Sequence, residues 1–208
     1  MNFTELRQEL FARGSNYLEE DAAGVARADR WLNQAYQDIL SLQAWPFLWA
    51  SALAEPPSYT VSVPDLRKIR FVTDTDGAEP GYPGRPLARG SMDALVNEGA
   101  DLSTQGTPEV YWVQQGNLVV PYPIGGIIRV DYIKRVPPMS GMDTPIFDSQ
   151  YHDLIVDKAM VKVYKDSDNM EQAAAVKEEY NEGAASMAED YMVESREPEF
   201  LEPTGEDS

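Results

Sequence analysis

The residues that could do chemistry in this chain are few and widely separated. Its single histidine, His152, follows a predicted helix start, and the chain has no cysteine to accompany it. A zinc site needs several nitrogen or sulfur ligands, and a nucleophile–histidine pair needs a hydroxyl or thiol beside the ring. We therefore interpret His152 as a residue of a helix face or of an interface.

Two short acidic stretches, 74–77 and 166–169, have the composition of calcium loops. Neither continues through the twelve-residue ligand spacing with its final bidentate glutamate, so ordinary turns explain them. The chain also lacks a glycine-rich phosphate loop and a Gly-x-Ser-x-Gly turn. No pair of carboxylates stands out for glycoside cleavage. The sequence predicts a protein that is not an enzyme and needs no cofactor or metal.

The chain is strongly acidic, with 35 Asp and Glu residues against 17 Lys and Arg residues and a formal charge of −18. Much of this charge lies after residue 165, where fourteen acidic residues face two basic ones. Binding in a DNA groove depends on basic side chains that neutralise phosphates, so the charge argues against it. The chain has no run of eighteen apolar residues and no signal-peptide pattern, so we expect a soluble, intracellular protein.

One stretch predicts an amphipathic helix. Apolar residues recur there at alternating steps of three and four, and Trp31, Tyr36 and Leu40 widen the face. The helix should end before Pro46, which lacks an amide donor, and residues 47–51 should be extended. A hydrophobic core and an interface are both open interpretations of its aromatic residues. The periodic positions are Val25, Ala28, Leu32, Ala35, Ile39 and Leu42.

The C-terminal part predicts two more helices. Residues 147–165 carry apolar residues on more than one side, and Asp148 or Ser149 can cap their start. After an interruption at 166–169, a second helix at 170–193 has one apolar stripe. Contact of this stripe with another subunit and packing within the subunit are equal alternatives. The stripe contains Met170, Ala173, Tyr180, Ala184, Met187 and Tyr191.

The last residues have too little apolar content to fold alone, and Pro198 and Pro203 prevent a continuous helix. Phe200 and Leu201 are the exception, because they form an apolar pair among carboxylates. A docking anchor and a frayed terminus are the two interpretations of this pair.

The middle of the chain predicts β structure. Strands are expected at 59–63 and 67–72, a short helix at 91–98, and a three-stranded meander from 110 to 132. The predicted fold class is therefore α+β, in which both chain ends form a helical core around an inserted antiparallel β-rich module. We expect core helices at 1–54 and 139–193, the module at 55–138, and a flexible acidic tail at 194–208.

Three segments near the chain ends form a recognisable pattern. They are a helix led by Thr4-Glu5-Leu6-Arg7, the Arg30-x-Leu32-Asn33-x-Ala35-Tyr36 helix with Trp45-Pro46-Phe47, and the Tyr151-His152-Asp153-Leu154-Ile155 helix with Ala159 and Tyr164. In this pattern the chain resembles the adaptor proteins of tailed bacteriophages, which extend the portal ring and join the head to the tail.

The resemblance implies a structural protein of the virion neck, assembled in the host cytoplasm. Its implied partners are the portal protein, neighbouring subunits of a homo-dodecameric ring, and the next tail or head-completion component. Genomic DNA would pass through the channel without sequence-specific binding, and no membrane is involved. Such adaptors commonly grip the portal with C-terminal segments, so we assign portal binding to Tyr191, Arg196, Phe200 and Leu201. We assign contacts between subunits to Trp31, Tyr180 and Met187.

Two other functions stay open at this point. An acidic DNA mimic would array carboxylates at phosphate-like spacing, although here the charge is concentrated near the C-terminus. A generic protein-binding domain could be built on the β module. The acidity itself has two interpretations, a solvated surface that favours solubility or a channel lining that repels DNA.

Overall fold

A computed structural model describes residues 1–54, 60–75, 84–91, 109–114, 117–120 and 126–194. The chain divides into two compact units. Residues 1–47 and 137–208 form the helical unit, and residues 48–136 form the β unit. The predicted α+β class is confirmed. The β unit spans residues 48–136, whereas the expected module spans 55–138. The main difference lies at the start, where a strand directly follows residue 48.

Helix α1 (Phe3–Arg13) begins with a complete capping box. The Asn2 side chain accepts a hydrogen bond from the Glu5 amide at 2.9 Å, and the Glu5 carboxylate accepts one from the Asn2 amide at 2.9 Å. These bonds satisfy amides that the first turn of a helix otherwise leaves without partners. Phe3, Leu6, Leu10 and Phe11 are buried.

Helix α2 (Ala22–Ser41) follows the predicted periodicity. Asp21 caps it by accepting a hydrogen bond from the Gly24 amide at 2.6 Å. Of the predicted stripe, Val25 is half-buried and Leu42 is exposed, because the helix ends one residue before Leu42. The buried members of the stripe are Ala28, Leu32, Ala35 and Ile39.

The segment after α2 differs in part from the prediction. Pro46–Leu48 form the short 3₁₀ helix η1, so Phe47 and Leu48 are not extended. Strand β1 (Trp49–Ala54) starts directly afterwards, as the predicted extended segment requires. Proline suits the first position of a helical turn, since its missing amide would have no partner there.

The C-terminal helices are α4 (Asp153–Asp166) and α5 (Met170–Glu194), preceded by the 3₁₀ helix η2 (Ser149–Tyr151). The predicted capping by Asp148 or Ser149 is wrong, because α4 starts later and no side-chain cap is formed there. Between the helices, Asp168 adopts a left-handed conformation with φ of 54°. Asn169 then caps α5 by accepting a hydrogen bond from the Gln172 amide at 3.3 Å.

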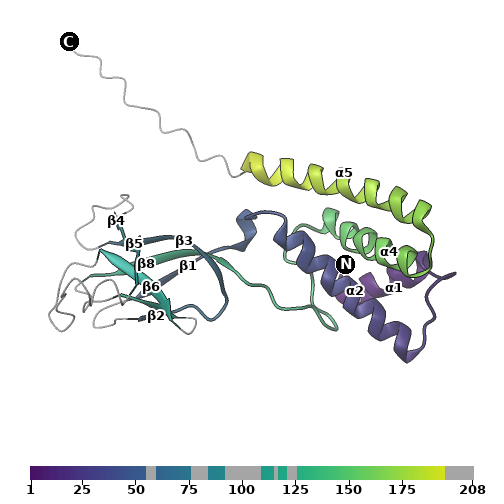
Figure 1. Cartoon of the computed structure of the whole chain (residues 1–208), viewed down its shortest axis with the longest axis horizontal. Coiled ribbons are helices and arrows are strands. Elements are labelled where there is room, and N and C mark those ends of the chain that lie inside the picture. Colours follow the sequence, from purple (N-terminus) through teal and green to yellow (C-terminus); the bar gives the residue numbers. More distant parts are fainter. Residues whose placement is uncertain (55–59, 76–83, 92–108, 115–116, 121–125, 195–208) are drawn as a thin grey trace, which may run out of the picture. The chain divides into compact units, whose positions relative to one another are not determined.

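Helix α4 is the centre of the helical unit. It packs against α1, α2 and α5, whereas α5 lies along α4 on the side away from α1 (Figure 1). This position explains why apolar residues surround α4. Its buried side chains are Leu154, Ile155, Val156, Ala159, Met160, Val161 and Val163.

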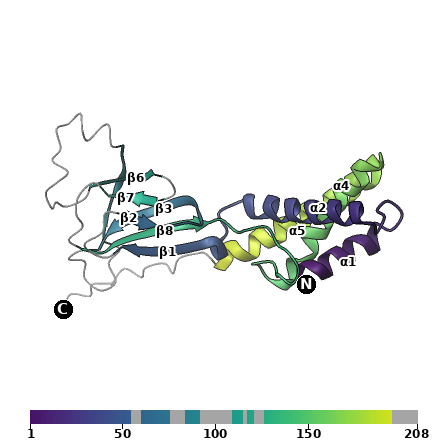
Figure 2. The same cartoon turned by 90° about the horizontal axis from the view of Figure 1, so that it is seen from below.

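The β unit is a sandwich of two four-stranded sheets (Figure 2). The first sheet has the order β1-β8-β3-β4, with β3 at Leu66–Asp74, β4 at Arg85–Pro86 and β8 at Ile128–Lys134. The second has the order β2-β7-β6-β5, with β2 at Thr60–Ser62, β5 at Ala88–Arg89, β6 at Val110–Gln114 and β7 at Asn117–Val119. The pairing is antiparallel throughout, except that β5 and β6 are parallel.

The predicted meander is wrong at its third strand. Strands β6 and β7 form the expected hairpin, but β8 pairs with β1 and β3 in the other sheet. Both sheets direct apolar residues inward, and β8 contributes Ile128, Val130 and Tyr132 to the shared core. The predicted short helix at 91–98 lies almost wholly outside the described residues.

Candidate interaction surfaces

The helical core depends on polar side chains that hold one extended stretch, residues 137–148, which we call the return segment. Asn33 of α2 bonds twice to the backbone of Met139. Its amide nitrogen donates to the Met139 carbonyl at 3.0 Å, and its side-chain oxygen accepts from the Met139 amide at 2.7 Å. This pair of bonds explains why an asparagine occupies this position of α2.

Two buried tyrosines act in the same way. The Tyr36 hydroxyl accepts a hydrogen bond from the Ile146 amide, and the Tyr191 hydroxyl accepts one from the Asp148 amide, each at 3.1 Å. Burial raises the pKa of Tyr36, so its hydroxyl stays neutral at physiological pH. Both hydroxyls thereby give hydrogen-bond partners to partly buried backbone amides of the return segment.

The start of α1 also binds the return segment. The Phe3 amide donates to the Asp143 carbonyl at 2.8 Å, and the Thr4 amide donates to the Gly141 carbonyl at 3.1 Å. The Thr4 hydroxyl donates to the Gly141 carbonyl as well, at 2.8 Å. The first-turn amides of a helix have no partners within it, so the return segment supplies them.

An aromatic cluster joins the two chain ends. Trp45 is fully buried, and its indole nitrogen donates to the Ile39 carbonyl at 2.8 Å. Phe47 stacks on Trp45 with ring centroids 5.6 Å apart and meets Tyr191 edge-on at 4.9 Å. Phe147 packs against both Phe47 and Tyr36. Edge-on and offset contacts of this kind add to the free energy of burying the rings.

His152 is buried at the start of α4 and serves the structure. Its Nε2 lies 3.0 Å from the Phe147 carbonyl, and its Nδ1 lies 2.6 Å from the N-terminal ammonium of Met1. A neutral ring with the proton on Nε2 satisfies both contacts. Burial lowers the pKa of His152, which keeps this neutral form dominant. His152 thus lies inside the fold of the subunit, at the turn that precedes α4.

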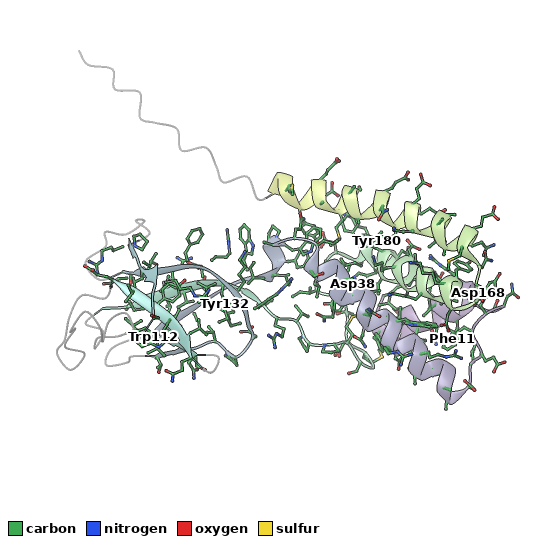
Figure 3. All side chains as sticks on the ribbon, in the orientation of Figure 1. Phe11, Asp38, Trp112, Tyr132, Asp168 and Tyr180 are labelled. Carbon is green, nitrogen blue, oxygen red and sulfur yellow. The ribbon has the colours of Figure 1, made fainter. Side chains whose placement is uncertain are left out.

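The predicted contact residues of α5 are occupied within the subunit. Tyr180, Met187 and Tyr191 are all buried, and Tyr180 lies on the side of α5 that faces α4 and α2 (Figure 3). The Lys158 ammonium of α4 lies 4.4 Å from the centre of the Tyr180 ring. The packing alternative therefore holds for these side chains in the single subunit, and their role between subunits stays a prediction.

The other predicted contact residues differ in their placement. Trp31 is half-buried on α2, so part of its ring is accessible. Arg196, Phe200 and Leu201 lie outside the described residues. The assignment of portal binding to these three residues therefore stays a prediction.

The outward side of α5 is a row of carboxylates. Most of its acidic side chains are exposed, whereas Ala173, Tyr180, Met187 and Tyr191 are buried; Met170, predicted in the same stripe, is exposed. Such a surface repels polyanions and other acidic surfaces. The exposed acidic residues of the helix are Glu171, Glu178, Glu179, Glu182, Glu189 and Asp190.

The most accessible apolar surface of the described β unit lies on the first sheet, on the face opposite the core. We call it the outer face. In β1 the small residues Ala50, Ala52 and Ala54 point inward, so Trp49 and Leu53 point outward. Leu53 is 60% exposed and Trp49 is 39% exposed, and Phe71 of β3 is 59% exposed. Sequence reasoning missed this face, although the large–small alternation of β1 signals it.

Cationic and polar groups complete the outer face. The Arg70 guanidinium lies 3.6 Å from the centre of the Trp49 ring and 5.5 Å from that of Phe71. In the middle of the sheet Arg129 pairs with Asp131 at 3.0 Å, and Asp131 also accepts a hydrogen bond from Ser51. A cavity of about 380 Å³ opens beside them, lined by Phe71, Thr73, Gly84, Pro86, Arg129 and Asp131.

Two kinds of feature are absent from the described residues. None of them form a group of three or more potential metal-ligating side chains. Among the same residues, no helix is long and apolar enough to cross a membrane.

A comparison with protein families decides the class. The family model described as SU10 adaptor protein matches residues 1–198, which include both units and the start of the tail. The chain belongs to the SU10 adaptor protein family. It is thus a bacteriophage adaptor, a structural component of the virion that interacts with other head–tail proteins. The comparison with individual curated proteins gives no match.

Membership of the SU10 adaptor family confirms the resemblance drawn from the chain ends. The structure also explains the residues that carry that pattern. Thr4, Asn33, Tyr36 and His152 each hold a backbone group of the helical core, so their chemical identity follows from the return segment. The match extends across the β unit, which the resemblance left unassigned.

Proposed function

We propose that this adaptor forms a ring beneath the portal, extends the DNA channel and provides the platform on which the tail attaches. The observation that carries the proposal is the adaptor-family match over residues 1–198. The compact helical unit supports it, because a ring wall needs a subunit that keeps its shape under the forces of packaging and ejection.

Symmetry gives the proposal its mechanism. A head-to-tail contact whose rotation closes produces a ring, and a ring that grows on a portal takes over the twelve-fold order of the portal. Each contact can be weak, because many tethered contacts act together. The partners are then the portal, two neighbouring subunits and the next tail or head-completion component.

The acidic row of α5 has a use in such a ring. Exposed carboxylates that face the lumen would repel DNA and keep it from adhering during transit. Changing Glu178, Glu182 and Glu189 to glutamine removes three negative charges without removing buried apolar surface. We expect slower DNA ejection from virions that carry this triple variant, measured by dye release. Unchanged ejection would count against a lumenal position for α5.

Electron microscopy of the full chain mixed with purified portal of the same phage tests the ring directly. The expected result is a closed additional ring on one end of the portal. Native mass spectrometry should give twelve copies of the chain per portal. A stable monomer that ignores the portal and instead captures a DNA-binding enzyme would refute the proposal and favour the DNA-mimic alternative.

The tail is tested separately by ending the chain after Val193. The buried positions of α5, up to Tyr191, are retained, so we expect the melting temperature to change by only a few degrees. Portal binding should be lost or strongly weakened, whether the tail touches the portal or links the subunits that bind it. Normal portal binding by the shortened chain would show that the tail is not needed for portal binding.

A further inference from the structure

We propose that the outer face of the β unit docks the acidic tail of a second copy of this chain, through residues 197–203. The proposal rests on the ring described above. It adds the identity of one contact between neighbouring subunits, which neither the family nor the fold specifies.

The first reason is the chemistry of the outer face. Trp49, Leu53 and Phe71 present a broad apolar surface on a sheet whose inner side is already packed. A monomer rarely exposes large apolar side chains together unless they bind something. Arg70 lies between two of these rings, so the surface combines apolar contact with positive charge.

The second reason is charge complementarity. The tail segment Glu197-Pro198-Glu199-Phe200-Leu201-Glu202-Pro203 places one aromatic and one aliphatic residue among three carboxylates. The complementary charge is local to the outer face, where the guanidinium groups of Arg70 and Arg129 lie beside the single carboxylate of Asp131. Phe200 and Leu201 would pack on the apolar residues, while the glutamates approach Arg70 and Arg129.

The third reason is an unsatisfied polar group in the cavity. Thr73 is buried and lines the cavity beside Phe71 and Arg129, and within the described part of the chain its hydroxyl has no hydrogen-bond partner. A buried hydroxyl without a partner is costly. An extended peptide carries backbone donors and acceptors at regular spacing, so a tail lying in the cavity would supply the missing bond.

The fourth reason is the length of the tail and the kind of contact it makes. Residues 195–208 follow α5, and the step from Glu194 to Phe200 spans at most about 20 Å when extended. A contact between a tail and a sheet face joins two different surfaces, so it is heterologous and propagates from copy to copy. Repeated around a portal, it would link each subunit to the next.

The absence of cysteine from the chain permits a direct test with full-length protein. A Leu53→Cys variant and an affinity-tagged Leu201→Cys variant are mixed, and disulfide formation between the two is followed on non-reducing gels. The matched control replaces Leu53→Cys by Met142→Cys, a residue of the helical unit that is 75% exposed. We expect the Leu53 mixture to form the mixed dimer at least about tenfold faster than the control, corresponding to about 1.4 kcal/mol of binding preference.

A second substitution in the Leu53→Cys chain tests whether positive charge on the outer face contributes to docking. Arg129→Glu should slow formation of the mixed dimer several-fold, whereas Arg89→Glu, the same change on the second sheet, should not. Salt at about 1 M should slow it too, because the Debye length falls to about 3 Å. Equal rates for the Leu53 and Met142 mixtures would overturn the proposal, as would equal effects of the two arginine changes.

The outcome is separable from that of the proposed function. Rings seen on portals with no preferential Leu53–Leu201 disulfide would refute tail docking alone, and would indicate a tail that binds only the portal. A preferential disulfide without rings on portals would refute the portal ring alone. A disulfide that forms only within one chain, in a protein carrying both changes, would also overturn docking between copies.

Discussion

The two units of this adaptor use their large side chains in opposite ways. In the helical unit, Trp45, Phe47, Phe147 and Tyr191 close on one another. In the β unit, Trp49, Leu53 and Phe71 face outward. The charge differs as well. Residues 48–136 carry eight basic and ten acidic residues, and the rest of the chain carries nine basic and twenty-five acidic residues.

This contrast separates two tasks. The helical unit satisfies its aromatic and polar groups internally, so it supplies a rigid frame with an acidic exterior. The β unit keeps an apolar face with cationic neighbours, which is the surface proposed for docking. The proposed ring would need both, because its subunits must resist deformation and still adhere to their neighbours.

The largest expected effect comes from two tryptophans four residues apart, Trp45 in the helical unit and Trp49 in the β unit. Trp45→Ala should lower the free energy of unfolding by about 3–5 kcal/mol, because it empties a fully buried site and removes the hydrogen bond to Ile39. Trp49→Ala should cost about 1 kcal/mol, mainly the contact with Arg70. Urea denaturation followed by far-ultraviolet circular dichroism measures both. Equal losses in the free energy of unfolding would contradict the proposed difference between the buried cluster around Trp45 and the outward-facing side chains around Trp49.

A second prediction concerns how closely α5 approaches α4. A Cβ atom on Gly183 would lie 2.4 Å from Leu154 Cδ2, so Gly183→Val requires the Leu154 side chain to move or the helices to separate. We expect a loss of about 1–3 kcal/mol in the free energy of unfolding, typical of an overpacked core. Ala185→Val, at an exposed position of the same helix, is the matched control and should have little effect. If both changes are neutral, α5 is not held tightly to the frame.

The third prediction uses pH to address the helical unit alone. Burial lowers the pKa of His152 in the folded state, so the unfolded chain binds its proton first as the pH falls. Stability that is full above the ordinary histidine pKa should fall between pH 7 and pH 5.5, by at most about 1.4 kcal/mol per pH unit. His152 is the chain's only histidine, so His152→Gln should flatten this dependence in urea titrations at each pH. A slope that persists in the variant would assign the effect to other groups.

The smallest effect is expected on the outer face. Phe71→Ser replaces a side chain that is 59% exposed and should change the free energy of unfolding by no more than about 0.5 kcal/mol. The same change should reduce the disulfide rate between Leu53→Cys and Leu201→Cys chains. A large loss of stability would mean that Phe71 belongs to the fold and not to a docking surface.

Local patterns predicted the helices well. The stripe of α2 is buried at Ala28, Leu32, Ala35 and Ile39, because the 3.6-residue period fixes which side chains share a face. The interruption around Asp168 followed from turn chemistry, whereas the cap of α5 by Asn169 was not predicted. The failure at the start of α4 has a local cause too, since residues 149–151 form a 3₁₀ turn before the helix begins.

Long-range pairing could not be predicted in the same way. Strand β8 follows β7 in the chain yet joins β1 and β3, and nothing in its own alternation distinguishes the two sheets. Similarly, Trp45 and Trp49 lie in one aromatic stretch, and only the change from η1 to β1 separates a buried ring from an outward one. The partners of Asn33 and Tyr36 lie more than a hundred residues away.

The pairing of β1 with β8 has a consequence for how such a protein can diversify. The first and last strands of the β unit are neighbours, and Trp49 lies opposite Ile133. The chain therefore enters and leaves the β unit through neighbouring strands, whose paired residues lie about 5 Å apart. A domain with adjacent ends can be exchanged for another of any size at little entropic cost to the rest. Recombination could thus replace the β unit while the helical unit stays unchanged.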